Sequence, residues 1–181
     1  MAISAMPAEH AILGLLDLTD GPGHGYDLAR NFAEGQPLSG VLRLEPGMLY
    51  HHLKKMEKSG WVVSSVEQQS SRPARQVYDL TDSGRAELKR WLAEPVKHTR
   101  EIRLEFLVKL YFARRTDPGL AVALVAGQLE ACRQWEVSLV EQLAEVELSE
   151  NSETDREFSR TVLRLRIAQT RAAIEWLGGF S

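Results

Sequence analysis

The chain has 181 residues, 44% of them hydrophobic and 26% charged, which fits one ordinary domain or two small ones and excludes a disordered or fibrous protein. No apolar run approaches the roughly 18 residues of a membrane span and no secretory signal pattern is present, so a cytoplasmic protein without a membrane partner is expected. A net charge of -3 gives no overall attraction to nucleic acid, and the single cysteine, Cys132, excludes an internal disulfide and a cysteine-cluster zinc site.

Apolar residues at helical spacing predict a helix over residues 8–19 and a second, shorter helix over residues 25–33. Glycine and proline end the first helix and break the second, which is followed by a loop. The third helix has the clearest start signal, because Pro46 fits the first helical position and Glu45 places a carboxylate at the positive end of the helix dipole. We expect this helix to run to Lys58.

The spacing of Leu49, Leu53 and Met56 fixes the buried face of the third helix. At about 100° per residue, the opposite face presents polar and basic side chains and a small residue near the helix start, namely Gly47, His51, Lys54, Lys55 and Lys58, with Tyr50 and Met48 on its flanks. Such a face suits the major groove of DNA, and a solvated basic surface is the alternative. The neighbouring His51 and His52 point about 100° apart, so no shared metal ion is expected.

Two short strands are predicted at residues 61–63 and 77–80, with a polar turn over residues 68–73 between them. Thr81 should cap a fourth helix that ends near Pro95. Three helices, a hairpin and a fourth helix form the order of a winged helix-turn-helix domain, in which the hairpin is the wing.

The charge is unevenly distributed along the chain. From Arg43 to Arg90 there are nine Lys and Arg against six Asp and Glu, so this segment carries +3 and the remainder carries -6. Arg72 and Arg75 flank the tip of the wing, where cations reach phosphates or the minor groove of bound DNA; a merely solvated loop is the alternative. A basic winged segment joined to an acidic helical segment is typical of a DNA reader with a separate protein-contact domain.

The rest of the chain predicts helices over residues 102–113, 118–148 and 158–177. The last helix carries two apolar stripes, and the long helix before it can cover only one. We therefore expect a second subunit to cover the other stripe, although a compact monomeric bundle is the alternative. The residues expected in dimerisation are Phe158, Val162, Leu165, Ile167, Ile174 and Trp176.

The predicted fold is mainly α with a small β-hairpin wing: a winged helix-turn-helix DNA-binding domain over residues 1–94 and a helical dimerisation domain over residues 95–181. Trp91, Phe106 and Trp135 are candidates to line a pocket for a small apolar or aromatic effector, with core packing as the stronger alternative. Cys132 lies in an apolar stripe and is expected to be an inert thiol. No catalytic triad spacing, phosphate loop or zinc-binding motif is present, so neither an enzyme nor a cofactor is expected.

Motifs in a fixed order resemble the PadR family of bacterial transcriptional regulators. They are Ile12-Leu13-Gly14-Leu15-Leu16, His24-Gly25-Tyr26-Asp27-Leu28, Pro46-Gly47-Met48-Leu49-Tyr50 continued by Leu53, Met56 and Gly60-Trp61-Val62, and Arg75 with Tyr78, Leu80, Thr81 and Gly84. The helical remainder resembles the C-terminal domain of the family's virulence-activator-like branch. The resemblance implies a homodimer with the recognition residues Tyr50, His51, Lys54 and Lys55 and the wing residues Arg72 and Arg75.

Residues and resemblance together predict a homodimeric regulator that reads double-stranded DNA at a palindromic operator, with repression as the favoured outcome. The alternative is a protein-interaction or effector-sensing adaptor that keeps the winged fold without reading DNA. The overall acidity of the chain is the best argument for that alternative.

Overall fold

The computed structural model describes residues 7–19, 21–69, 72–149 and 152–180, and of residues 68, 69 and 72–74 it describes the backbone alone. Its elements occur in the order α1 (Pro7–Asp17), β1 (Gly23–His24), α2 (Gly25–Arg30), η1 (Pro37–Gly40), α3 (Pro46–Lys58), β2 (Val62–Gln69), β3 (Arg72–Leu80), α4 (Asp82–Ala93), α5 (Thr99–Glu101), η2 (Ile102–Phe106), α6 (Leu107–Thr116), α7 (Pro118–Leu148) and α8 (Glu153–Gly178).

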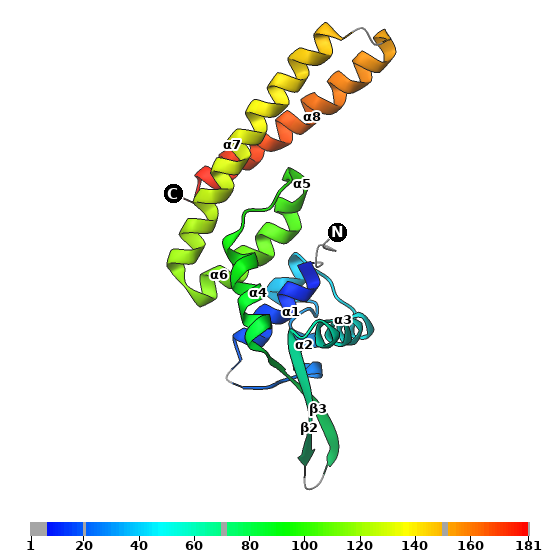
Figure 1. The fold of residues 1–181 in the computed structure, drawn as a ribbon, viewed down its shortest axis with the longest axis vertical. Helices are drawn as coiled ribbons and strands as arrows, with labels where there is room; N and C mark the ends of the chain where they lie inside the picture. Colours follow the sequence, from blue (N-terminus) through cyan, green and yellow to red (C-terminus); the bar gives the residue numbers. More distant parts are fainter. Residues whose placement is uncertain (1–6, 20, 70–71, 150–151, 181) are drawn as a thin grey trace.

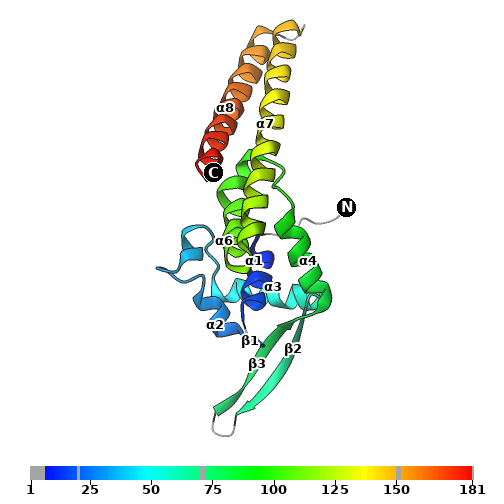
Figure 2. The ribbon, with the colours of Figure 1, turned by 90° about the vertical axis from the view of Figure 1, so that its left-hand side faces the viewer.

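The fold is mainly α with one small antiparallel sheet in the strand order β1-β3-β2, which confirms the predicted fold class. Strands β2 and β3 form the wing, a hairpin that projects from the helices (Figure 1). Helices α7 and α8 form a long antiparallel pair that extends away from the wing (Figure 2). The described helices include none that is long and apolar enough to cross a membrane.

Most helix boundaries follow from local signals. Helix α3 begins at Pro46 and ends at Lys58 as predicted, and α7 begins at Pro118. The hydroxyl of Thr81 caps α4 by accepting the backbone N–H of Gly84 at 3.1 Å. Helix α8 starts earlier than expected, at Glu153, because the hydroxyl of Ser152 accepts the N–H of Asp155.

The wing is longer than the sequence indicated. The strands were expected at residues 61–63 and 77–80, but β2 continues to Gln69 and β3 already begins at Arg72. Their outer halves carry mostly polar side chains, so the alternation of apolar and polar residues that marks a half-buried strand is missing. Backbone pairing continues there with an irregularity between Glu67 and Gln69. Strand β1 and the short helix η1 also lie in segments expected to be loops.

One core joins the winged part to the helical part. Helix α1 lies at its centre, and the core also contains Val108 and Phe112 of α6. Gly14 of α1 allows this contact, since a Cβ at that position would lie 2.6 Å from Cδ1 of Phe112. Helix α6 therefore packs directly on α1. Further cores lie between α6, α7 and α8, where Cys132 is buried and burial raises the pKa of its thiol.

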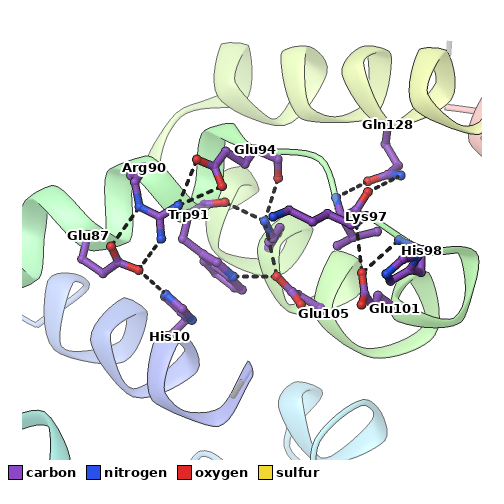
Figure 3. Close-up of polar contacts among 12 residues, drawn as sticks. His10, Glu87, Arg90, Trp91, Glu94, Lys97, His98, Glu101, Glu105 and Gln128 are labelled. Carbon is purple, nitrogen blue, oxygen red and sulfur yellow. Dashed lines mark hydrogen bonds and ion pairs between the residues drawn. The ribbon is translucent and has the colours of Figure 1, made fainter. Parts of the chain in front are cut away.

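A buried polar network reinforces this junction (Figure 3). The Lys109 ammonium of α6 donates hydrogen bonds to the carbonyls of Trp91 and Glu94 at the end of α4, at 2.7 and 2.6 Å. A cation at this place complements the negative end of the helix. Trp91 donates its indole N–H to Glu105 at 2.8 Å and stacks on His10 of α1, with 4.4 Å between ring centroids.

Candidate nucleic-acid interface

Helix α3 is anchored by the three apolar residues that the sequence identified. Leu49, Leu53 and Met56 are fully buried in the core of the winged part. Their register turns the expected polar face outward, and the residues exposed on it are Gly47, Tyr50, His51, Lys54 and Lys58. We call these five residues together with Arg75 of the wing the reading face.

The cations of the reading face lie apart from the acidic side chains that the structure describes. Among the described residues, no Asp or Glu oxygen lies within 4.0 Å of the charged atoms of Lys54, Lys58 or Arg75. No side chain projects from Gly47 near the start of α3, and a Cβ built there meets no atom within 4 Å. This face can therefore approach a polyanion closely with its positive charge available.

Lys55 differs from the other lysines of α3. Its side chain is 41% exposed, and its Nζ donates a hydrogen bond of 2.6 Å to Oε1 of Glu9 in α1, whose side chain is only 2% exposed. The same carboxylate oxygen lies 3.2 Å from Nδ1 of the buried His52. Glu9 thus ties two consecutive turns of α3 to α1. Its carboxylate pairs with the Lys55 ammonium, so the charge of Lys55 is partly neutralised within the protein.

Helix α3 and the wing meet at a cleft of about 500 Å³. Tyr50 from α3 and Arg75 from β3 both line it, and so does Tyr26 at the start of α2. Gly25 brings the Tyr50 ring close to α2, because a Cβ there would lie 2.7 Å from Cε1 of Tyr50. The structure therefore brings together two of the predicted residues that lie 25 positions apart in the sequence.

Two residues of this region were missed as functional candidates. Tyr26 is 70% exposed and lines the same cleft as Tyr50 and Arg75. A large aromatic residue at the start of α2, the α-helix before α3, is the signal that could have identified it. Glu9 has no such signal, because only the fold shows that it faces α3. Arg72 begins β3, but its side chain lies outside the described residues.

The candidate effector residues do not share a cavity. Trp91 belongs to the core around α1, whereas Phe106 is fully buried in the core beneath α7 and α8. Trp135 is half-buried and lines a different cleft between α7, α8 and the segment that follows α4. In the described part of the chain, no group of three His, Cys, Asp or Glu side chains could hold a metal ion.

The residues expected in dimerisation fall into two groups. Phe158, Val162, Leu165 and Trp176 are exposed on α8. Ile167 is buried against the same chain's Leu139 and Leu163, and Ile174 is partly buried against the core beneath α7 and α8. These two isoleucines stabilise the α7/α8 pair itself, so the available apolar surface is formed by the first group.

Residues 12–90 match the Transcriptional regulator PadR-like family, and residues 102–178 match the Virulence activator alpha C-term family. The chain belongs to the PadR-like family. Its winged part and its long helical pair correspond in position to these two matches.

Two curated relatives of this PadR-like chain are transcriptional regulators by name. A probable transcriptional regulator of Mycobacterium tuberculosis is 39% identical over 95 residues, which are 52% of this chain and 48% of that protein. The negative transcriptional regulator PadR of Bacillus subtilis is 34% identical over 124 residues, 67% of this chain and 65% of that protein. The matches thus span less than two thirds of either relative.

Among solved structures, Bacillus subtilis PadR in complex with operator DNA is similar, with 27% identity, coverage of 95% of each chain and a TM-score of 0.46.

Proposed function

We propose that this protein is a transcriptional regulator that binds double-stranded DNA through the reading face and represses transcription as a homodimer. One observation carries the proposal: Tyr50 of the recognition helix and Arg75 of the wing line one cleft, on a face whose lysines have no carboxylate partner within 4.0 Å among the described residues. Membership of a family of transcriptional regulators and the name of the negative regulator from Bacillus subtilis support it.

The proposal assigns residues 1–94 to DNA binding and residues 95–181 to dimerisation. Arg72 is included in the DNA contact of the wing from its place in the sequence. A regulator of this kind acts where the bacterial chromosome lies, in the cytoplasm, and its work is binding rather than catalysis.

DNA binding is tested with the full chain and the DNA upstream of its own coding sequence. Footprinting locates the protected site, and fluorescence anisotropy then gives affinity at several salt concentrations. Lys58→Ala with Arg75→Ala removes one cation from α3 and one from the wing, so the slope of log affinity against log salt should become shallower by about 1.8. Arg133→Ala is the control, because Arg133 lies on α7 beside Glu130.

An unchanged slope in the double variant would show that this face does not contact DNA. Absence of any binding to heparin or to the upstream DNA would favour the adaptor instead.

For the dimer, we propose that a second copy covers the exposed stripe of α8. Phe158, Val162 and Leu165 are 71%, 38% and 59% exposed and follow the i, i+4, i+7 spacing of one helix face. A two-fold axis through such a contact relates two reading faces, which fits a palindromic operator.

Light scattering on a size-exclusion column tests the dimer. Wild type should elute as a dimer at micromolar concentration, and Phe158→Ser with Leu165→Ser should elute as a monomer. Val66→Ser is the matched control, because Val66 is 64% exposed on the wing. A wild-type monomer, or a double variant that stays dimeric, would contradict the assignment of this stripe.

A further inference from the structure

A second cleft, of about 470 Å³, lies where residues 97–100 meet α7 and α8. Lys97, His98, Arg100 and Arg166 line it, and none of its ten lining residues is acidic. Two lining residues, Trp135 and Leu139, are apolar, and the remaining four carry amide or hydroxyl groups: Thr99, Ser138, Gln142 and Gln169. The volume suits a small molecule, and the lining suits a hydrophilic and negatively charged one.

The cations of this cleft are separated from the acidic side chains that the structure describes. In the described ranges, no Asp or Glu oxygen lies within 4.0 Å of the charged atoms of Lys97, Arg100 or Arg166. Four other arginines of α7 and α8 do pair with glutamates: Arg133, Arg156, Arg160 and Arg171. Unpaired cations gathered at one cleft of an otherwise acidic helical part create a local positive potential.

The segment that carries Lys97 is held in place by its backbone (Figure 3). The buried Gln128 of α7 accepts the N–H of Val96 at 2.8 Å. The carboxylate of Glu101 accepts the N–H groups of Lys97 and His98 at 2.9 and 3.0 Å. Lys97 and His98 therefore project from a backbone that the protein's own hydrogen bonds hold in place, which lowers the entropic cost of binding.

We propose that this cleft binds a small hydrophilic anion with more than one negative charge, such as a polycarboxylate or a phosphorylated metabolite. The polar lining favours such a ligand over the apolar or aromatic effector expected from the sequence. Binding itself does not depend on the proposed function, but its role as the effector of a DNA-binding regulator rests on that function.

The position of the cleft separates it from the reading face. Helix α5, which follows Lys97, lies on the side of the winged part opposite to the wing (Figure 1). DNA bound along the wing and α3 therefore does not fill this cleft. A ligand here would contact the segment that connects α4 to the helical part, so it would bind beside the junction of the two parts.

Isothermal titration of the full-length protein without DNA tests the site. The probes are citrate, as the polycarboxylate, and glucose 6-phosphate, as the phosphorylated metabolite; acetate at equal ionic strength is the control for weak anion effects. We expect one of the two probes to bind and acetate not to bind. Arg100→Gln with Arg166→Gln should weaken that binding by about tenfold or more, because two charge-assisted hydrogen bonds are lost.

Arg133→Gln with Arg171→Gln is the matched control, since it removes two positive charges from α7 and α8 outside the cleft and should leave binding unchanged. Both residues of the Arg100/Arg166 double variant have exposed side chains, so its fold should remain intact, as circular dichroism can verify. Failure of both probes to bind, or equal binding by wild type and the double variant, would overturn the proposal.

If instead the double variant weakens the dimer and no probe binds, a second copy occupies the cleft and the proposal is wrong. If the proposed function is wrong but the cleft proposal is right, citrate or glucose 6-phosphate binds and DNA does not.

Discussion

Two adjacent lysines of α3 should respond to substitution in opposite ways. Lys54 is exposed and has no carboxylate within 4.0 Å in the part of the chain that is described, whereas Lys55 donates a 2.6 Å hydrogen bond to the buried Glu9. Lys54→Ala should therefore weaken DNA binding and leave the free energy of unfolding unchanged. Lys55→Ala should lower the free energy of unfolding and leave the salt dependence of DNA binding nearly unchanged.

The expected sizes follow from these surroundings. Loss of one phosphate contact makes the slope of log affinity against log salt shallower by about 0.9, so between about 50 and 200 mM salt wild type should lose about threefold to fourfold more affinity than Lys54→Ala. Removal of one partner from a fully buried ion pair costs about 3–5 kcal/mol. Lys55 is 41% exposed and His52 remains 3.2 Å from the same oxygen, so about 1–3 kcal/mol is expected for Lys55→Ala.

Fluorescence anisotropy over a salt series measures the first effect, and urea denaturation measures the second. In a Glu9→Gln background, Lys55→Ala should lower the free energy of unfolding by less, because the buried carboxylate that Lys55 neutralises is gone. A slope for Lys55→Ala as shallow as that for Lys54→Ala, with unfolding free energy unchanged, would refute the positioning role of Lys55. An unchanged slope for Lys54→Ala would refute its phosphate contact.

Three further substitutions test the packing that supports the reading face. Gly84→Ala would drive a Cβ into the carbonyl oxygen of Trp61 and should destabilise the fold by about 1–3 kcal/mol in urea denaturation. An unaffected denaturation midpoint would contradict this close approach. Gly25→Ala should displace the Tyr50 ring and weaken DNA binding in anisotropy, by no more than Tyr50→Ala does; binding equal to wild type would show that this ring position is unimportant. Burial lowers the pKa of His10 below its ordinary 6.5, so the unfolded chain binds more protons and stability is lost as pH falls below about 6.5. His10→Phe should reduce that loss, measured as the difference in thermal unfolding between pH about 7 and about 5.5. An identical pH dependence in the variant would contradict the lowered pKa of His10.

Local signals in the sequence were sufficient for α3. Pro46 at its start and the spacing of Leu49, Leu53 and Met56 determine both its length and its buried face, so the exposure of Lys54 and Lys58 could be predicted. The different surroundings of Lys55 could not, because its partner Glu9 lies 46 residues away and faces it only in the folded chain. Helical spacing assigns a direction to a side chain but does not identify the element that packs there.

The same limit explains the C-terminal half. Two apolar stripes on α8 were visible in the sequence, but which stripe faces α7 depends on how the two helices rotate against each other. The structure places Ile167 toward Leu139 of α7 and leaves Phe158 and Leu165 exposed. The effector residues were predicted from aromatic character alone. Large aromatic side chains also fill hydrophobic cores, which is where the structure places Trp91 and Phe106.

Helix α1 links the reading face to the helical part through two adjacent residues. Glu9 holds α3 through Lys55. The ring of His10 stacks on Trp91 of α4, and its Nε2 lies 2.9 Å from Oε1 of Glu87, also of α4. One turn further along α1, the contact between Gly14 and Phe112 leaves no space for α6 to move closer. Because a close-packed interior resists continuous deformation, a shift of α6 would have to move α1, and with it the orientation of α3. Under the proposed function, the orientation of the reading face toward DNA would therefore be set partly by residues of the helical part, away from α3 and the wing.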